Sequence, residues 1–410
     1  MNCKFLLSAT FISATLFANA QEQATTAYAI TGKSNNIYYW ADIKQIDISS
    51  GKILKTLFEA DKTKYNTAFL DKADFDNARI NPTAYGTAAC ALDTRHNRLY
   101  FAPMHFSEIQ YLDLSKEEVN FTVVKKNLIA KPANSAFQSE EAQLTRMVIA
   151  ADGFGYALSN DANHLIRFST DKKATVTDLG AITDEKNSAI SIHEKIEAWG
   201  GDMVADAFGN LIVVSARHNV FSIDVNTKTA KHIGSITGLP ENYTTNGVVV
   251  DTDGNLVVSS ANVLDGLYNV NSKTYVATKV KSEEKSFNAS DMANANLLSQ
   301  KQYNEMHGIA PGGCIPAENA TEVKKGSKVF PNPITSNKFN IQFNNLEAGT
   351  YNVVLTNISG KVLQTSVIDL AKGETSKAVT IGQKPIRGFY LVKIINASKK
   401  IVSSEKVLIN

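Results

Sequence analysis

The chain has 410 residues, enough for two or three domains with well-packed cores. Its composition, 43% hydrophobic and 20% charged residues, is that of a folded protein and excludes a disordered chain. The net charge of +2 hides an asymmetry, because residues 324–410 carry 13 basic and 4 acidic residues and the remainder carries 29 and 36. We expect a small basic domain after a large acidic one. We interpret the positive charge of the small domain as a contribution to solubility, and attraction to an acidic partner is the alternative. No nucleic-acid partner is expected.

The N-terminus predicts a secretory signal peptide over residues 1–20. Lys4 precedes an apolar run from Phe5 to Phe17, and the ending Ala18-Asn19-Ala20 is typical of a cleavage site. The apolar run is too short to span a membrane, and no later run approaches the roughly 20 residues of a transmembrane helix. The mature protein is therefore expected to be exported, without a transmembrane segment.

Two cysteines remain after removal of the signal peptide, Cys90 and Cys314. Export permits a disulfide between them, which would tie the end of the large domain to an early part of it. The alternative is a buried free Cys90 in an apolar run and an unrelated Cys314 in a glycine-rich loop. Their spacing matches no zinc or redox motif.

Residues 21–298 predict a β-propeller, because a unit of four short strands recurs along them. The clearest copy runs from Gly200 to Ile236, where alternating apolar and polar residues are bounded by Gly, Asn, Asp and Thr turns. A single four-stranded sheet cannot bury both faces, so the copies are expected to pack in a ring. Five copies of the third strand begin at Ile43, Ile109, Leu165, Val220 and Leu267.

The two ends of this region are expected to close the ring. First-strand turns recur near Asp93, Asp152, Asp206 and Asp251, and a weaker fifth copy begins at Ser290. Since the N-terminal segment lacks a clear first strand, Asp291–Leu298 should complete the blade begun by residues 27–59, which gives five blades and hides the sheet edges. If Tyr28–Thr31 and Ile37–Trp40 are instead a first and a second strand, a sixth blade is needed.

Three insertions interrupt the repeats: residues 62–82, residues 126–143 and the helical-looking segment 188–199. Loops of this kind project from the faces of a propeller, where binding sites are expected. From residue 299 to 328 the periodicity fails, and this stretch is interpreted as a linker.

Residues 329–410 predict a small Ig-like β-sandwich of short alternating strands. Strands are expected at residues 338–344, 350–357, 361–368, 376–381, 387–396 and 400–409. Pro-Asn-Pro gives a rigid start, Gly360 suits a hairpin, and Gly388 allows a turn into the following aromatic strand.

The same segment resembles the type A C-terminal sorting domain of type IX secretion cargo. The resemblance depends on four motifs that contain Pro331, Asn332, Pro333, Gly360, Gly388, Tyr390, Lys393 and Lys406. It implies a Gram-negative bacterium, passage through the periplasm, and delivery by a type IX translocon to an outer-membrane shuttle barrel. In the family a sortase-like peptidase commonly removes the domain, so the resemblance further implies cleavage within residues 320–328 and attachment of the protein to surface lipopolysaccharide.

Polar residues recur near the predicted inner strands of the ring. Arg146, Asp202, Asn246 and Asp291 fall at similar points of successive repeats, and Trp199 precedes one of those strands. A ring of satisfied salt bridges is the favoured interpretation, with a small-ligand site or a lactonase-like metal centre as alternatives. An arginine in the ring disfavours a metal, and no histidine pair or Gly-x-Ser-x-Gly motif supports catalysis, so neither a metal nor a cofactor is expected.

The sequence thus favours a secreted or cell-surface propeller that binds a protein or glycan through its face loops, a binding or adhesion module and not an enzyme. The alternative is a secreted hydrolase or lyase, lactonase-like, acting at the mouth of the channel. Trp199 would then be a platform for sugar stacking, whereas its other interpretation is a core residue.

Overall fold

The computed structural model describes residues 24–33, 36–74, 81–307, 326–332, 334–344, 348–357, 362–371, 376–382, 387–396 and 401–409. The chain forms two compact units, and the boundary between them lies between Ala317 and Glu318. The predicted signal peptide and Cys314 lie outside the described residues. No described helix is both long and apolar enough to cross a membrane.

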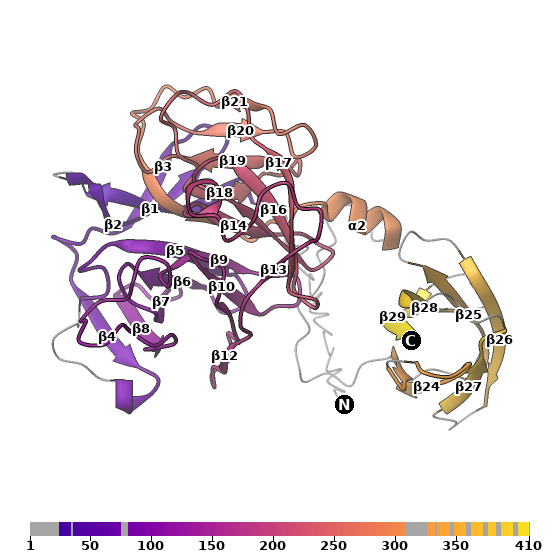
Figure 1. The fold of residues 1–410 in the computed structure, drawn as a ribbon. Coiled ribbons are helices and arrows are strands. Elements are labelled where there is room, and N and C mark those ends of the chain that lie inside the picture. Colours follow the sequence, from indigo (N-terminus) through magenta and orange to yellow (C-terminus); the bar gives the residue numbers. More distant parts are fainter. Residues whose placement is uncertain are drawn as a thin grey trace, which may run out of the picture. The chain divides into compact units, whose positions relative to one another are not determined.

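The first unit contains five sheets among its described residues (Figure 1). The first sheet runs in the order β22 (Ala289–Ala293), β1 (Thr26–Lys33), β2 (Asn36–Asp47) and β3 (Ile53–Phe58). The second contains β5 (Thr87–Asp93), β6 (Arg98–Pro103), β7 (Ile109–Asp113), β8 (Val119–Lys125) and β4 (Tyr65–Phe69). The third contains β9 (Leu144–Ile149), β10 (Gly155–Ser159), β11 (Leu165–Phe168) and β12 (Val176–Asp178).

The fourth and fifth sheets repeat the pattern. The fourth contains β14 (Asp202–Ala205), β15 (Asn210–Val214), β16 (Asn219–Asp224), β17 (Thr229–Ser235) and β13 (Thr183–Asp184). The fifth contains β18 (Gly247–Val250), β19 (Leu256–Ser259), β20 (Tyr268–Val270) and β21 (Ala277–Lys279). The third strands expected from the repeats are β2, β7, β11, β16 and β20, which confirms that part of the sequence interpretation.

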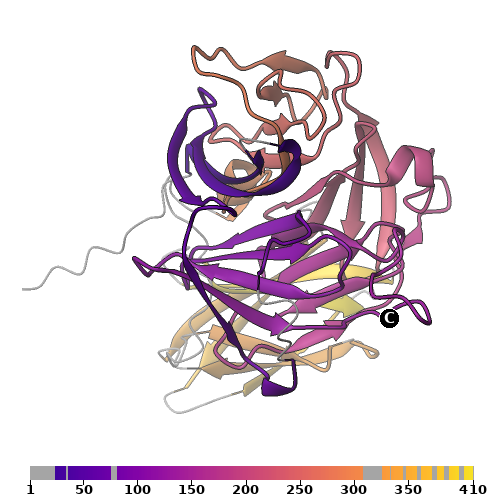
Figure 2. The ribbon, with the colours of Figure 1, turned by 90° about the vertical axis from the view of Figure 1, so that its left-hand side faces the viewer.

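The five first strands of these sheets form a closed ring at the centre of the unit. Each contacts the next in the order β22, β5, β9, β14, β18 and back to β22. This cyclic arrangement of radiating sheets is that of a β-propeller. Figure 2 shows the ribbon of Figure 1 turned by 90° about the vertical axis. Strands β5, β10, β14, β15, β18 and β19 are almost entirely buried because sheets converge on both of their faces near the axis.

The ring closes as the sequence predicts. Ile30 of β1 pairs with Asp291 of β22, so a strand from the end of the first unit is the innermost strand of the sheet that begins it. Strand β1 is thus the second strand of its sheet, and Ile37–Trp40 belongs to the third strand, β2. The alternative of a separate first and second strand at these positions is wrong, because β22 occupies the inner position.

The insertions differ from their expected forms. Residues 62–82 supply β4, which pairs in parallel with β8 and covers the outer edge of the second sheet, and a 3-10 turn, η1 (Lys72–Asp74). In the segment 188–199 only α1 (Lys195–Ala198) is helical, with its start capped by the Glu194 carboxylate. The residues before α1 are held by other segments instead: Ile192 N–H donates to Asp184, and the His193 ring bonds the carbonyl groups of Asp161 and Ile182.

Helix α2 (Gln300–His307) follows β22 inside the stretch expected to be a linker. The chain first forms an isolated bridge between Leu298 and Asp206 beside the fourth sheet. Tyr303 of α2 then packs edge-on against Phe208, with ring centroids 5.4 Å apart. The start of the expected linker is therefore part of the first unit.

The second unit has two antiparallel sheets that share one hydrophobic core. One contains β23 (Gly326–Phe330), β24 (Lys338–Asn344) and β27 (Ser376–Thr380). The other contains β26 (Val362–Leu370), β25 (Gly349–Asn357), β28 (Gly388–Asn396) and β29 (Ile401–Ile409). The sequence interpretation missed β23, which falls mostly in the supposed linker, and located the other six within two residues at each end.

Candidate functional site

The inner strands bring together side chains that are far apart in the sequence. Strand pairing places Arg146, Asp202 and Asp291 at equivalent positions, each directly before a methionine of its strand. Gly247 occupies that position in the fifth sheet, so Asn246 lies one residue before it. Three of the four polar residues predicted for the ring therefore share one level of it.

Arg146 is completely buried, and its side chain hydrogen-bonds backbone carbonyl groups of neighbouring loops. Its guanidinium donates hydrogen bonds to the carbonyl oxygens of Gly200 at 3.0 Å and Ser159 at 3.1 Å, and also to those of Asn160 and Ala198. Burial lowers the pKa of Arg146 to about 10, and the nearby Asp161 and Asp202 act in the opposite direction. No described carboxylate forms a salt bridge with it, so the favoured ring of salt bridges is wrong for this residue: carbonyl groups satisfy the charge instead.

Asp202 and Asp291 form a buried carboxyl pair at the centre of the ring. Asp202 accepts hydrogen bonds from the backbone N–H groups of Met203 and Val248, each at 2.6 Å. Asp291 Oδ1 accepts from the backbone N–H and from the thiol of Cys90, each at 2.9 Å. Asp291 Oδ2 is buried and has no hydrogen-bond partner among the described residues, and Asp202 is close enough for its charge to act on Asp291.

Two buried carboxylates this close cannot both ionise at little cost, so the pair retains a proton. Burial is the main cause that raises the pKa of Asp202, to about 8, against hydrogen bonds that lower it. Burial and then the charge of Asp202 raise the pKa of Asp291 well above its usual value. Asp202 links β14 to β18 and Asp291 links β22 to β5, so each carboxyl group ties two neighbouring inner strands together.

Cys90 is a free, fully buried thiol. Burial and then the neighbouring Asp291 raise its pKa well above the ordinary value. Because the thiol donates to Asp291 inside the ring, the free Cys90 of the sequence analysis is the form seen here, and a disulfide to Cys314 is not. Burial of this kind makes a thiol inert.

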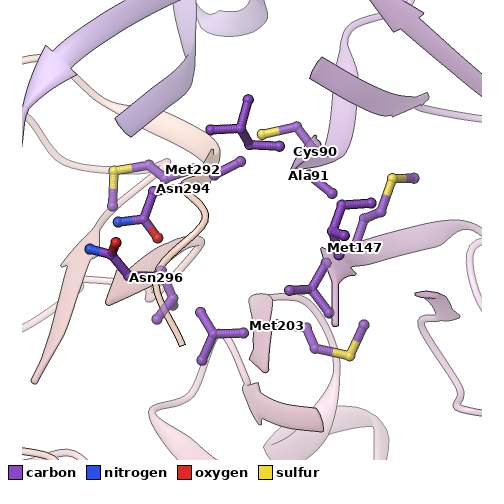
Figure 3. A pocket seen from close by; sticks show the side chains of 13 residues that line it. Cys90, Ala91, Met147, Met203, Met292, Asn294 and Asn296 are labelled. Carbon is purple, nitrogen blue, oxygen red and sulfur yellow. The ribbon is translucent and has the colours of Figure 1, made fainter. Parts of the chain in front are cut away.

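Next to the carboxyl pair the inner strands line a partly open hollow of about 10 Å³, about the room that one water molecule needs. Figure 3 shows Cys90, Met147, Met203 and Met292 around it. Asn294 and Asn296, which follow β22, also line it, and both donate to the carbonyl of Val250. The channel is thus packed with side chains at this level.

Asn246 and Trp199 lie outside this cluster. Asn246 Oδ1 accepts from the backbone N–H of Ala261 at 3.1 Å and fixes a loop. Trp199 is half-buried, donates to the carbonyl of His193 at 3.3 Å, and has the Lys195 ammonium 4.6 Å from its ring centroid. The lysine covers one ring face, so the tryptophan presents at most the other to a ligand.

A cluster of aromatic residues lies on the loops at the end of the second sheet where β5 begins. We call Tyr85, His105, Phe106 and Phe137 the aromatic cluster. Phe137 packs 5.5 Å from Tyr85, 5.8 Å from Phe106 and 5.6 Å from His105, measured between ring centroids. Tyr85 is 40% exposed and Phe137 42% exposed, whereas Phe106 is buried.

The aromatic cluster was missed by sequence reasoning, which indicated only the insertions that supply Phe137 and the segment before Tyr85. Backbone hydrogen bonds hold its three loops together: Gln138 donates to His105 at 2.8 Å, and Met104 to Gly86 at 3.0 Å. Their spacing in the sequence gives no sign of this contact.

No group of three or more His, Cys, Asp or Glu side chains that could hold a metal occurs among the described residues. The donor atoms at the centre of the ring do not suit one either. Both carboxyl groups are already bonded to backbone N–H groups, and the third charged side chain there is a guanidinium.

In the second unit the residues of the resemblance hold the ends of the domain together. Asn332 Oδ1 accepts from the backbone N–H of Leu408 at 2.8 Å, and Ile334 donates to the carbonyl of Leu408 at 2.7 Å. Tyr390 on β28 is buried in the core, and Lys393 on the same strand pairs with Val354 and Ser404. Gly388 begins β28, whereas Pro333, Gly360 and the side chain of Lys406 lie outside the described residues.

Residues 328–410 match the model of the secretion system C-terminal sorting domain. The chain is a type IX secretion cargo with a C-terminal sorting domain. This domain implies interaction with the type IX secretion machinery and export to the cell surface or the extracellular space.

Comparison with solved structures gives distant likenesses. One is PorZ of Porphyromonas gingivalis, described as an essential surface component of the type IX secretion system, at 15% identity, with 90% of this chain and 50% of PorZ covered and a TM-score of 0.32. The chain thus spans half the length of PorZ. Another is virginiamycin B lyase of Staphylococcus aureus, at 11% identity, 79% and 95% coverage and a TM-score of 0.30. No curated protein matches the chain.

Proposed function

We propose that this cargo is a five-bladed propeller that binds a protein or glycan at the cell surface or outside the cell, and that it is not an enzyme. We infer where the protein acts from a single observation, the match of residues 328–410 to the C-terminal sorting domain. The closed ring of five inner strands supports five blades, because each described sheet supplies one of them.

The state of the central carboxyl groups supports binding over catalysis. Asp202 and Asp291 are fully buried, and backbone N–H groups occupy both oxygens of Asp202 and Oδ1 of Asp291. A general acid or base must reach the proton that it transfers. These residues act as ties between strands. The lactonase-like alternative required the same two carboxylates at an accessible reaction site, so their burial argues against it.

The aromatic cluster is the binding surface that we favour. Exposed Tyr85 and Phe137 offer apolar ring area, and His105 adds a polar group at the same place. Aromatic rings with a polar neighbour suit a sugar ring or an apolar side chain of a protein partner. The three loops are joined by backbone hydrogen bonds, which limits the entropy lost on binding.

The proposed route begins with removal of residues 1–20 on entry to the periplasm. The type IX translocon and an outer-membrane shuttle barrel then recognise residues 329–410, an Ig-like sandwich whose two sheets share one core. Residues 299–328 join this domain to the propeller of residues 21–298. A sortase-like peptidase cleaves within residues 320–328, and the released propeller is attached to surface lipopolysaccharide.

Deletion of residues 328–410 tests the route. In a Gram-negative host with a type IX system, we expect the truncated protein to remain in the periplasm, measured by fractionation and by protease accessibility on intact cells. The full chain in the same host is the control. Undiminished surface delivery of the truncated protein would contradict the proposal.

A double variant, Tyr85→Ser with Phe137→Ser, tests the binding surface. We expect it to lose binding on a glycan array and to intact bacterial cells, with unchanged thermal stability. Tyr38→Ser is the matched control, because Tyr38 is 61% exposed and lies outside the aromatic cluster. Equal loss in both variants would show that the aromatic cluster is not the site.

The enzyme alternative requires a variant that keeps the fold. Asp291→Asn preserves the acceptor that faces Cys90, whereas Asp291→Ala would remove the tie between β22 and β5. Turnover of a lactone panel by the wild type, abolished in Asp291→Asn while its melting temperature is kept, would favour the hydrolase.

A further inference from the structure

A cleft of about 460 Å³ lies between the third and fourth sheets, at the end of the first unit that carries the turns between first and second strands. This size falls within the usual range of small-molecule sites. The cleft is distinct from the aromatic cluster and shares no residue with the carboxyl pair. It is lined by Ala150, Asp152, Tyr156, Arg167, Leu179, Gly209, Val225, Asn226 and Lys228.

On the side of the third sheet the polar groups are held in place by one another. Asp152 Oδ2 accepts from the Tyr156 hydroxyl at 2.7 Å, and Oδ1 accepts from the backbone N–H of Phe154 at 3.0 Å. The guanidinium carbon of Arg167 lies 4.8 Å from the centroid of the Phe154 ring, which is a cation–π contact. The guanidinium is thus positioned before a ligand arrives.

On the side of the fourth sheet Lys228 supplies a second cation. Its ammonium group donates to the carbonyl of Leu179 at 2.7 Å, a bond that uses one of its three N–H donors. Asn226, two residues earlier, is exposed at the same edge. The two cations come from different sheets, so a ligand that contacts both would bridge them.

The balance of groups indicates the chemistry of the ligand. Two cations against one carboxylate attract an anion, and arginine suits a carboxylate in particular because its paired N–H groups match the two oxygens. Asp152 and Asn226 can bond hydroxyl groups, and the apolar side chains of Ala150, Leu179 and Val225 can contact C–H faces. A small carboxylate that also carries several hydroxyl groups meets all of these demands.

We propose that this cleft binds a hexuronic acid, with the carboxylate between Arg167 and Lys228 and the hydroxyl groups toward Asp152 and Asn226. The proposal does not depend on the aromatic cluster or on the proposed function. The hexuronic acid is either a free monosaccharide or a unit of an acidic polysaccharide, and both present the same carboxylate and hydroxyl groups.

Isothermal titration calorimetry on the full mature chain tests the proposal with four probes: D-galacturonate, tetragalacturonate, D-galactose and acetate. We expect galacturonate to bind. Galactose, which lacks the carboxylate, and acetate, which lacks the hydroxyl groups, should each bind at least about tenfold more weakly. Tighter binding of tetragalacturonate than of galacturonate supports a polysaccharide as the source, and equal affinity supports the monosaccharide. Failure of both uronates to bind would overturn the proposal, as would equal affinity for galactose or acetate.

Two variants locate the site. Arg167→Gln and Lys228→Met should each weaken uronate binding about tenfold or more, since each removes a charged hydrogen-bond donor. Lys231→Met is the matched control on the same sheet, because Lys231 pairs with Glu185 outside the cleft and is exposed. Melting temperatures close to wild type confirm that a variant is folded, and either cleft variant suffices if the other fails to fold. Wild-type affinity in a folded cleft variant would overturn the assignment.

Discussion

Replacing Asp291 by Asn tests the shared proton at the centre of the ring. The asparagine side chain has nearly the same shape as the carboxyl group, and its oxygen can accept from the backbone N–H of Cys90, as Oδ1 of Asp291 does. The variant therefore keeps the hydrogen bond to Cys90 but has no proton to lose at this position.

The folded state of the wild type holds a proton on Asp291 at pH values where an unfolded aspartate, with a pKa near 4, has lost it. Because the folded pKa is raised, this contribution to stability is fully present below about pH 4 and is lost as the pH rises toward the folded pKa. The free energy of unfolding therefore falls as the pH rises through this window, by at most about 1.4 kcal/mol per pH unit for one proton.

Urea unfolding at pH 5, 6 and 7, followed by tryptophan fluorescence, measures this dependence. Both tryptophans, Trp40 and Trp199, lie in the first unit, so the signal reports on the propeller. We expect the slope of the free energy of unfolding against pH to be less negative in Asp291→Asn, by up to about 1.4 kcal/mol per pH unit. Asp253→Asn, at an exposed carboxylate, should run parallel to the wild type. Equal slopes in Asp291→Asn and the wild type would refute the shared proton.

Three further predictions concern the same ring. Arg146→Met should lower the free energy of unfolding by about 3 kcal/mol or more, because several buried carbonyl groups lose a charged donor; a loss below about 1 kcal/mol in urea unfolding would contradict this role. In a Cys314→Ser background, Cys90 should react with a thiol reagent only after addition of denaturant, and rapid reaction of the native protein would show that the thiol is accessible. Gly201→Ala should prevent stable folding because its Cβ would lie 1.9 Å from the carbonyl oxygen of Val214, whereas Gly209→Ala, with a similar φ and open space, should cost only about 1 kcal/mol by thermal unfolding.

Much of the strand order could be predicted from the sequence because its physical cause is local. A strand that is buried on one face alternates apolar and polar residues, and Asp, Asn and Gly mark its turns, so β16 and its relatives are visible one repeat at a time. Strand β23 was missed because five residues beside a polar stretch give little periodicity. The helix expected over residues 188–199 was wrong beyond Lys195–Ala198, because the loop makes its contacts to other parts of the ring.

The sequence by itself determined that sheets repeat, that the last strand of the first unit closes the ring, and that a sorting domain ends the chain. Only the tertiary structure decided what the polar residues do, because a repeat gives the position of Asp202 or Arg146 along a strand but not the groups that it meets across the axis. The same holds for Tyr85 and Phe137, which contact each other although 51 intervening residues separate them. Hydrogen bonds and packing between distant segments depend on closure of the whole ring, and no short stretch of sequence records them.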